Sequence, residues 1–152
     1  MRLAEALIKR KELFNTLSSL IERIGEEAVI PEDETPSETA AELLEEYDGL
    51  VSQLDDLIGR INKTNNKTKL TETKTLSDAI IKRDMLKLKH NAYESILNNI
   101  AYSSRKRVKK DEVKYLSTLS VPGIRKALDN IAKEIRELNV SLQATNWAVE
   151  LE

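Results

Sequence analysis

The chain has 152 residues, of which 40% are apolar and 33% charged, and its 24 Lys and Arg nearly balance its 26 Asp and Glu. This length suits one domain with a real core, and a net charge of -2 predicts no partner by itself. The absence of cysteine excludes disulfides and thiolate metal sites, and few aromatic residues beside many Leu, Ile, Lys and Glu are typical of long helices. We therefore expect a single domain over residues 1–152.

Four segments carry an apolar stripe in alternating steps of three and four residues, interrupted only by single polar residues. In chain order the stripes are Leu3, Leu7, Arg10, Phe14, Leu17, Ile21 and Ile24; Ala40, Leu44, Tyr47, Val51, Leu54, Ile58 and Ile61; Leu76, Ala79, Arg83, Leu86, His90, Tyr93, Leu97 and Ile100; and Ile124, Leu128, Ile131, Ile135, Leu138 and Leu142. Such spacing keeps one helix face apolar over many turns. The sequence predicts an all-α bundle of four long, heptad-patterned antiparallel helices.

The first helix is expected from residue 2 to 24, ending near Gly25. Its apolar face is wide, because Ala6, Leu13 and Leu20 flank the main stripe. A narrow two-stranded seam does not need these flanking residues. We therefore expect this helix to pack against at least two neighbours.

A second helix is predicted after an acidic connector. Residues 35–38, Thr-Pro-Ser-Glu, form a capping-box pattern with proline at the first helical position, which predicts a helix from there to about Asn62. The Asn and Thr residues of 62–74 compete for backbone hydrogen bonds and predict a loop.

The third and fourth helices are separated by a change of period. Thr75, with an acid three residues later, caps a third helix over 75–103. Apolar residues then alternate at odd positions, which predicts a short extended segment over 113–121. Ser120 is positioned to cap the last helix, which should reach about residue 147.

Charge is segregated along the chain. Between Ile24 and Gly59 there are twelve acids and no Lys or Arg, whereas between Arg60 and Lys114 there are fifteen bases against six acids. An acidic second helix beside a basic third helix would fix helix pairing, within the chain or across subunits, without an external ligand. Because each helix has more apolar face than a four-helix monomer hides, we expect a homo-oligomer.

One run of the sequence suggests nucleic-acid binding as an alternative function. Its five basic residues, which would neutralise phosphates, are Arg105, Lys106, Arg107, Lys109 and Lys110. No aromatic stacking residues are interleaved, and acids follow at once at 111–112. The favoured interpretation is a solvated or subunit-contacting turn, with nucleic acid not expected as a partner.

Polar residues on the stripes are candidates for structural or interaction roles. His90 is the one histidine, whereas a di-iron bundle needs two Glu-x-x-His motifs, so we expect no metal and no cofactor. Arg83 also lies on a stripe, where buried polar residues often fix register and oligomer state. No phosphate loop, nucleophile elbow or Cys–His pair occurs, so we expect neither an enzyme nor a small-molecule substrate.

Four further residues are singled out beyond the generic core. They are Asn62, Asn65, Asn146 and Trp147. A buried asparagine can bond to the backbone of a loop, and a tryptophan near the end of the last helix can pin its final turn. Replacement of Trp147 by alanine is therefore expected to lower the melting temperature.

Short motifs across the chain resemble those of the septicolysin-like family of small bacterial helical proteins. They are Leu3 to Leu7, Arg60 to Asn65, Thr75-Leu76, Arg83 to Leu86, Glu112 to Lys114, Ala144 to Trp147 and Glu150-Leu151, with a departure at Thr73-Lys74, where an acid-glycine turn is expected. The resemblance implies a pore-forming cytolysin as a second alternative function, but it carries over no active-site residues.

The sequence lacks what a membrane-active toxin or a secreted protein needs. Eight charged residues within the first 25 leave no apolar signal core, and the longest charge-free stretch, Leu138 to Val149, has twelve residues against about 20 for a membrane-spanning helix. A membrane partner is therefore not expected. The hypothesis that best fits the residues is a cytoplasmic, non-enzymatic, self-associating helical protein with a structural or protein-interaction role.

Overall fold

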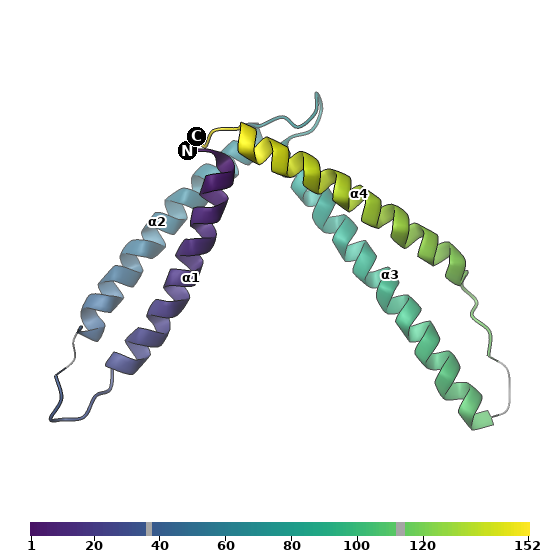
Figure 1. Ribbon diagram of the computed structural model, residues 1–152, viewed down its shortest axis with the longest axis horizontal. Coiled ribbons are helices and arrows are strands. Elements are labelled where there is room, and N and C mark those ends of the chain that lie inside the picture. The colour runs from purple at the N-terminus through teal and green to yellow at the C-terminus, as the bar shows by residue number, and fades with distance from the viewer. Residues whose placement is uncertain (36–37, 112–114) are drawn as a thin grey trace. The chain divides into compact units, whose positions relative to one another are not determined.

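A computed structural model gives the fold (Figure 1), and it describes residues 1–35, 38–111 and 115–152, without the side chains of 105–111. The four helices are α1 (Leu3–Glu27), α2 (Ala40–Lys67), α3 (Leu76–Asp111) and α4 (Val121–Ala148). Within these described ranges there is no β-strand. The predicted all-α fold of four long helices is confirmed.

The chain forms two compact units. The first unit comprises Met1–Lys69 with Ala144–Glu152, and the second comprises Leu70–Gln143. In the first unit α1 and α2 run antiparallel, and in the second unit α3 and the matching part of α4 do the same (Figure 1). The single domain expected over 1–152 stays a prediction.

The core of the first unit is a seam between α1 and α2 with strict heptad spacing. Its buried residues are Leu3, Ala6, Leu13, Leu17 and Leu20 on α1, and Leu43, Leu54, Leu57, Ile61 and Thr64 on α2, while Ala4 is buried beside the seam. Half-buried Arg10, Ile24, Tyr47 and Leu50 occupy the intervening positions, so that the steps alternate between three and four residues.

The seam of the first unit differs from the predicted stripes by one row of residues. The predicted main stripe contains Phe14 and Ile21, but both are exposed. Leu13 and Leu20, predicted to lie beside the stripe, are buried in the seam instead. Both rows are apolar, so composition does not decide which row faces the other helix. The displaced row remains on the surface of the pair.

The seam of the second unit matches the predicted stripes. Leu76, Ala79, Ile131 and Leu142 are buried, and the other stripe residues of α3 and α4 are half-buried. Beside the seam, Lys82 Nζ lies 3.5 Å from Glu134 Oε1, an ion pair between the two antiparallel helices.

The start of α2 corrects the predicted cap. The helix begins at Ala40, where the Thr39 hydroxyl accepts a hydrogen bond from the Glu42 amide (3.2 Å) and the Glu42 carboxylate accepts one from the Thr39 amide (3.0 Å). The sequence therefore contains a second capping box four residues after the predicted one. Thr35 is outside the helix, and Pro36 and Ser37 lie outside the described residues.

The other two predicted caps are confirmed. At the start of α3, the Asp78 amide donates to the Thr75 hydroxyl (3.2 Å), and the Thr75 amide donates to the Asp78 carboxylate (2.8 Å). At the start of α4, the Gly123 amide donates to the Ser120 hydroxyl (3.2 Å).

Both α2 and α3 run beyond their predicted ends. α2 continues to Lys67 through the Asn- and Thr-rich stretch, because packing around Thr64 overrides the weak helix propensity of these residues. α3 continues to Asp111 through Arg and Lys, which are good helix formers. The predicted extended segment has no strand among residues 115–120, Val121 already belongs to α4, and the rest of that segment lies outside the described residues.

Candidate interaction surface

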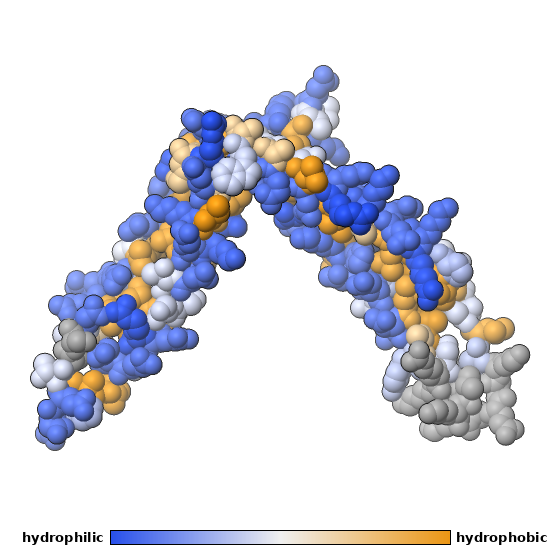
Figure 2. Space-filling view, viewed as in Figure 1, coloured by the Kyte–Doolittle hydropathy of each residue, from blue (hydrophilic) through white to orange (hydrophobic). Residues whose placement is uncertain are grey.

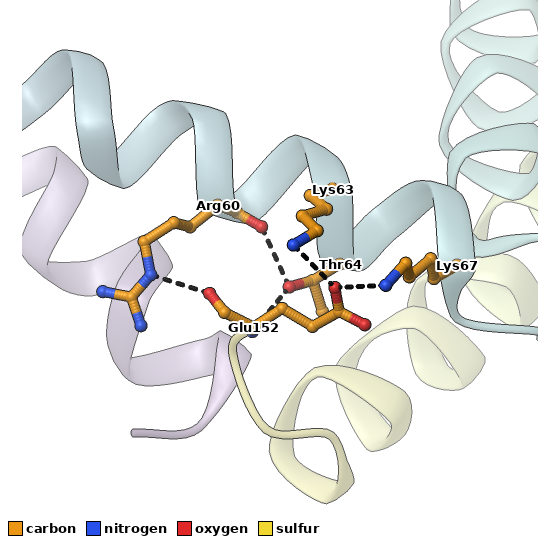
Figure 3. Close-up of polar contacts among 5 residues, drawn as sticks. All are labelled: Arg60, Lys63, Thr64, Lys67 and Glu152. Carbon is orange, nitrogen blue, oxygen red and sulfur yellow. Dashed lines mark hydrogen bonds and ion pairs between the residues drawn. The ribbon is translucent and has the colours of Figure 1, made fainter.

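The end of the described chain is held against α2 by a cluster around Glu152 (Figure 3). The Glu152 amide donates to the hydroxyl of buried Thr64 (3.0 Å), which in turn donates to the Arg60 carbonyl (2.9 Å). Arg60 Nε donates to the Glu152 backbone oxygen (2.7 Å). Lys67 and Lys63 place their ammonium groups 2.8 and 3.5 Å from the Glu152 carboxylate.

The first and last residues of the first unit are also joined through their backbones. The Leu3 amide donates to the Val149 carbonyl and the Leu151 amide donates to the Met1 carbonyl, both at 2.9 Å, around an antiparallel bridge between Arg2 and Glu150. Arg2 Nη1 donates to the Ala148 carbonyl (2.9 Å), and Leu151 is buried. This arrangement satisfies the exposed backbone groups at the start of α1 and the end of α4.

The charge of Glu152 is stabilised in the folded protein. The hydrogen bond from Lys67 lowers the pKa of the Glu152 carboxyl below its ordinary value of 4.5, and the positive charges of Lys67 and Lys63 act in the same direction. The cluster thus has a structural function, since all its members are engaged with one another.

This cluster is not among the site residues predicted from the sequence. Its signal was a threonine, Thr64, at a seam position that is otherwise apolar, with bases at 60, 63 and 67 on the neighbouring face of the same helix. That pattern predicts an acidic partner but does not identify Glu152.

The apolar row displaced from the seam forms a surface that we call the apolar flank. It consists of Leu7, Phe14 and Ile21 on α1, and Leu44, Val51 and Ile58 on α2. Phe14, Ile21, Leu44 and Val51 are 51, 57, 51 and 40% exposed, whereas Leu7 and Ile58 are half-buried. Figure 2 shows hydrophobic side chains along both helical pairs, between mostly hydrophilic ones.

Both halves of the apolar flank lie on one side of the α1/α2 pair. Each flank residue follows a residue of the d-type seam row by one position, as Phe14 follows Leu13 and Leu44 follows Leu43. Antiparallel helices are related by a half-turn about an axis perpendicular to the plane of the pair, which leaves equivalent rows on the same side. One surface depression brings Lys9 of α1 together with Gln53, Asp56 and Arg60 of α2, which sets the register of the two helices. With this register the heptad spacing places Leu7 level with Ile58, Phe14 with Val51, and Ile21 with Leu44.

The opposite side of the pair is polar. The equivalent row there contains Lys9, Thr16 and Arg23 on α1, and Glu46, Gln53 and Arg60 on α2, which we call the polar flank. One surface depression is lined by Lys9 together with Gln53 and Arg60, so the two halves of the polar flank share a side. The pair is therefore amphipathic as a whole, apolar on one side and polar on the other.

The predicted site residues of the first unit lie near the end of α2 and the end of α4. Asn62 is exposed, Asn65 and Asn146 are half-buried, and Trp147 is 54% exposed. Their structural or interaction roles stay predictions.

The predicted site residues of the second unit both lie on the seam of α3. The Arg83 guanidinium donates two hydrogen bonds to Asp84 Oδ1, at 3.0 and 2.9 Å, and His90 Nδ1 lies 3.5 Å from Glu94 Oε2. Arg83 and His90 are half-buried and one heptad apart.

The basic run of the sequence is in the last turns of α3, and its side chains lie outside the described part of the structure. Nucleic-acid binding there is therefore untested. The residues of the run are Arg105, Lys106, Arg107, Lys109 and Lys110.

Among the described residues, no helix offers the length of apolar sequence that a bilayer crossing requires.

The fold defines a class of all-α protein built from two antiparallel helical pairs. Within that class, the chain belongs to a family of unknown function, DUF6847, whose model matches residues 10–151. It is similar to a solved structure described as the crystal structure of a functionally unknown conserved protein from Corynebacterium diphtheriae, with 37% identity and a TM-score of 0.93 over 100% of this chain and 99% of that chain. No curated protein matches the sequence.

The resemblance to the septicolysin-like family is therefore wrong. The matching family model and the similar solved structure are both described as of unknown function, and neither indicates that family. Motifs such as Leu3 to Leu7 and Thr75-Leu76 are a seam segment and a helix start, which many helical proteins share. The pore-forming alternative rested on this resemblance alone and is withdrawn with it.

Proposed function

We propose that this protein is a non-enzymatic, cytoplasmic helical protein that self-associates through its apolar surface and acts through protein–protein contacts. The observation that carries the proposal is the apolar flank. A contiguous apolar face on one side of an amphipathic helical pair is the usual signature of a contact surface. The exposed parts of Phe14, Ile21, Leu44 and Val51 gain free energy when another surface removes them from water.

The charged groups of the described residues support a structural role over a chemical one. Arg83 bonds to Asp84, His90 lies beside Glu94, and Lys82 pairs with Glu134. Each titratable group named here lies beside a neighbouring charge, an arrangement that contributes little stability but leaves none of these groups isolated for chemistry.

Sedimentation velocity of the full chain over a range of concentrations tests the proposal. We expect an assembly larger than one chain, and dissociation on replacing Phe14 by glutamate, because the charge would have to be buried in the contact. Thr16→Glu, on the polar flank of the same helix, is the matched control and should leave the assembly intact. A wild-type protein that stays monomeric at tens of micromolar contradicts the proposal.

A further inference from the structure

We infer that the occupant of the apolar flank is the same flank of a second copy, packed so that α1 of each copy lies on α2 of the other. This inference rests on the proposed self-association and specifies its geometry. The resulting dimer contains a four-helix bundle made from two α1/α2 pairs. The two pairs are related by a two-fold axis parallel to the helices.

The shape of the flank suits a copy of itself. Its three levels, Leu7 with Ile58, Phe14 with Val51, and Ile21 with Leu44, have an apolar side chain on both helices at every level. A two-fold axis parallel to the helices keeps each level and exchanges the two helices. Phe14 of one copy then meets Val51 of the other, and an apolar residue meets an apolar residue throughout the contact.

The charged residues that border the apolar flank distinguish the packing of α1 on α2 from the packing of α1 on α1. The rim is the next row outward on each helix, Ala4, Lys11, Ser18 and Gly25 on α1, and Ala41, Asp48, Asp55 and Asn62 on α2. With α1 on α2, Lys11 lies level with Asp55 of the second copy and Ser18 lies level with Asp48. Opposite charges therefore meet twice in the dimer.

The alternative two-fold axis, perpendicular to the helices, places α1 on α1 and α2 on α2. Levels above and below Phe14 then exchange, so Asp48 meets Asp55 of the second copy twice and Lys11 meets only Ser18. Like charges at a contact rim are unfavourable, while the first arrangement pairs Asp55 with a base. Charge complementarity therefore selects the packing of α1 on α2.

Cross-linking tests the geometry directly, because the chain has no cysteine of its own. Two proteins, Ser18→Cys and Asp48→Cys, are mixed and oxidised with glutathione disulfide, and the products are identified by non-reducing electrophoresis and mass spectrometry. We expect a disulfide-linked dimer that contains one of each variant. The matched control is a mixture of Lys11→Cys and Ser18→Cys, which should link only if α1 lies on α1.

Charge exchange provides a second readout. Lys11→Glu places an acid beside Asp55, and Asp55→Lys places a base beside Lys11, so each should raise the dimer Kd roughly tenfold through two symmetric pairs. The double variant restores both pairs and should return the Kd to within about twofold of wild type. In the alternative packing, Asp55→Lys instead strengthens the dimer, because it removes two contacts between acids.

The outcomes separate this inference from the proposed function. A monomer under all conditions overturns both. A dimer that links Lys11→Cys with Ser18→Cys, or that links neither mixture, overturns the packing of α1 on α2 and leaves self-association standing. A dimer that links Ser18→Cys with Asp48→Cys and recovers its Kd in the charge-exchanged double variant supports the inference.

Discussion

The carboxylate of Glu152 and the ammonium of Lys67 lie 2.8 Å apart, although 85 residues separate them in the sequence. Together with Thr64, which is buried, this contact anchors the last residues of the first unit on α2. The folded state of the first unit therefore depends on a carboxylate whose pKa lies below its ordinary value of 4.5.

Stability is expected to fall at low pH partly through Glu152. Because Lys67 lowers the pKa of the folded carboxyl, its stabilising contribution is complete above the ordinary value of 4.5 and is lost as the pH falls below that value. Melting temperatures of wild type and Glu152→Gln should therefore differ at pH 7, and the difference should shrink progressively as the pH falls below 4.5. A difference that is constant over this range would show that ionised Glu152 contributes nothing.

Thr64→Val is expected to destabilise the first unit by about 1 kcal/mol. Valine has the same shape but cannot accept the hydrogen bond that the Glu152 amide donates in the buried site. Urea denaturation measures the loss. Thr16→Val is the matched control, because the Thr16 hydroxyl makes the same bond to the carbonyl four residues earlier but is exposed, and it should change stability by only a few tenths of a kcal/mol.

Thr39→Ala is expected to destabilise α2 by about 1 kcal/mol, because it removes the side-chain acceptor for the Glu42 amide. Thr35→Ala should have almost no effect, since Thr35 lies outside the helix. Urea denaturation of the two variants gives the free energy of unfolding lost with each threonine. An equal loss from Thr35→Ala would place the start of the helix where the sequence analysis first predicted it.

Leu151→Ala should lower the melting temperature more than Trp147→Ala. Leu151 is 9% exposed and its removal leaves a cavity, at a cost of about 2 kcal/mol, whereas Trp147 is 54% exposed and loses less contact. Differential scanning calorimetry of the two variants gives the order. The opposite order would assign the anchoring of the last helical turn to the indole.

The sequence predicts the helices better than their outward faces. The seams of α3 and α4 coincide with the predicted stripes, and residues such as Ile131 and Leu142 are buried as the stripe indicates, although apolar Ile81 and Leu88 lie off the α3 stripe and are exposed. On α1 and α2 three adjacent rows are apolar, so the pattern cannot tell whether Leu13 or Phe14 faces the neighbouring helix. That choice is made by packing between helices, which no local pattern encodes.

The sequence predicts a wide apolar face on the first helix but does not show which of its rows is exposed. The wide apolar face of the first helix predicts at least two neighbours. In the structure this helix packs on α2 and leaves Phe14 and Ile21 exposed, so the second neighbour stays a prediction. The cluster around Glu152 was not predictable from local sequence, because Glu152 lies 85 or more residues from its partners on α2 and neither Thr64 nor Glu152 belongs to a recognisable motif.

Closure of the first unit by residues 144–152 has a consequence for the order of folding on the ribosome. The partners of Leu3, Thr64 and Lys67 lie in residues 144–152 and are synthesised after the whole of the second unit. Until residues 144–152 are synthesised, the α1/α2 hairpin lacks the Glu152 amide that donates to the Thr64 hydroxyl and the Val149 carbonyl that accepts from the Leu3 amide. In nascent chains stalled before residue 144, the start of α1 and the end of α2 should therefore be less protected from hydrogen exchange than in the full chain.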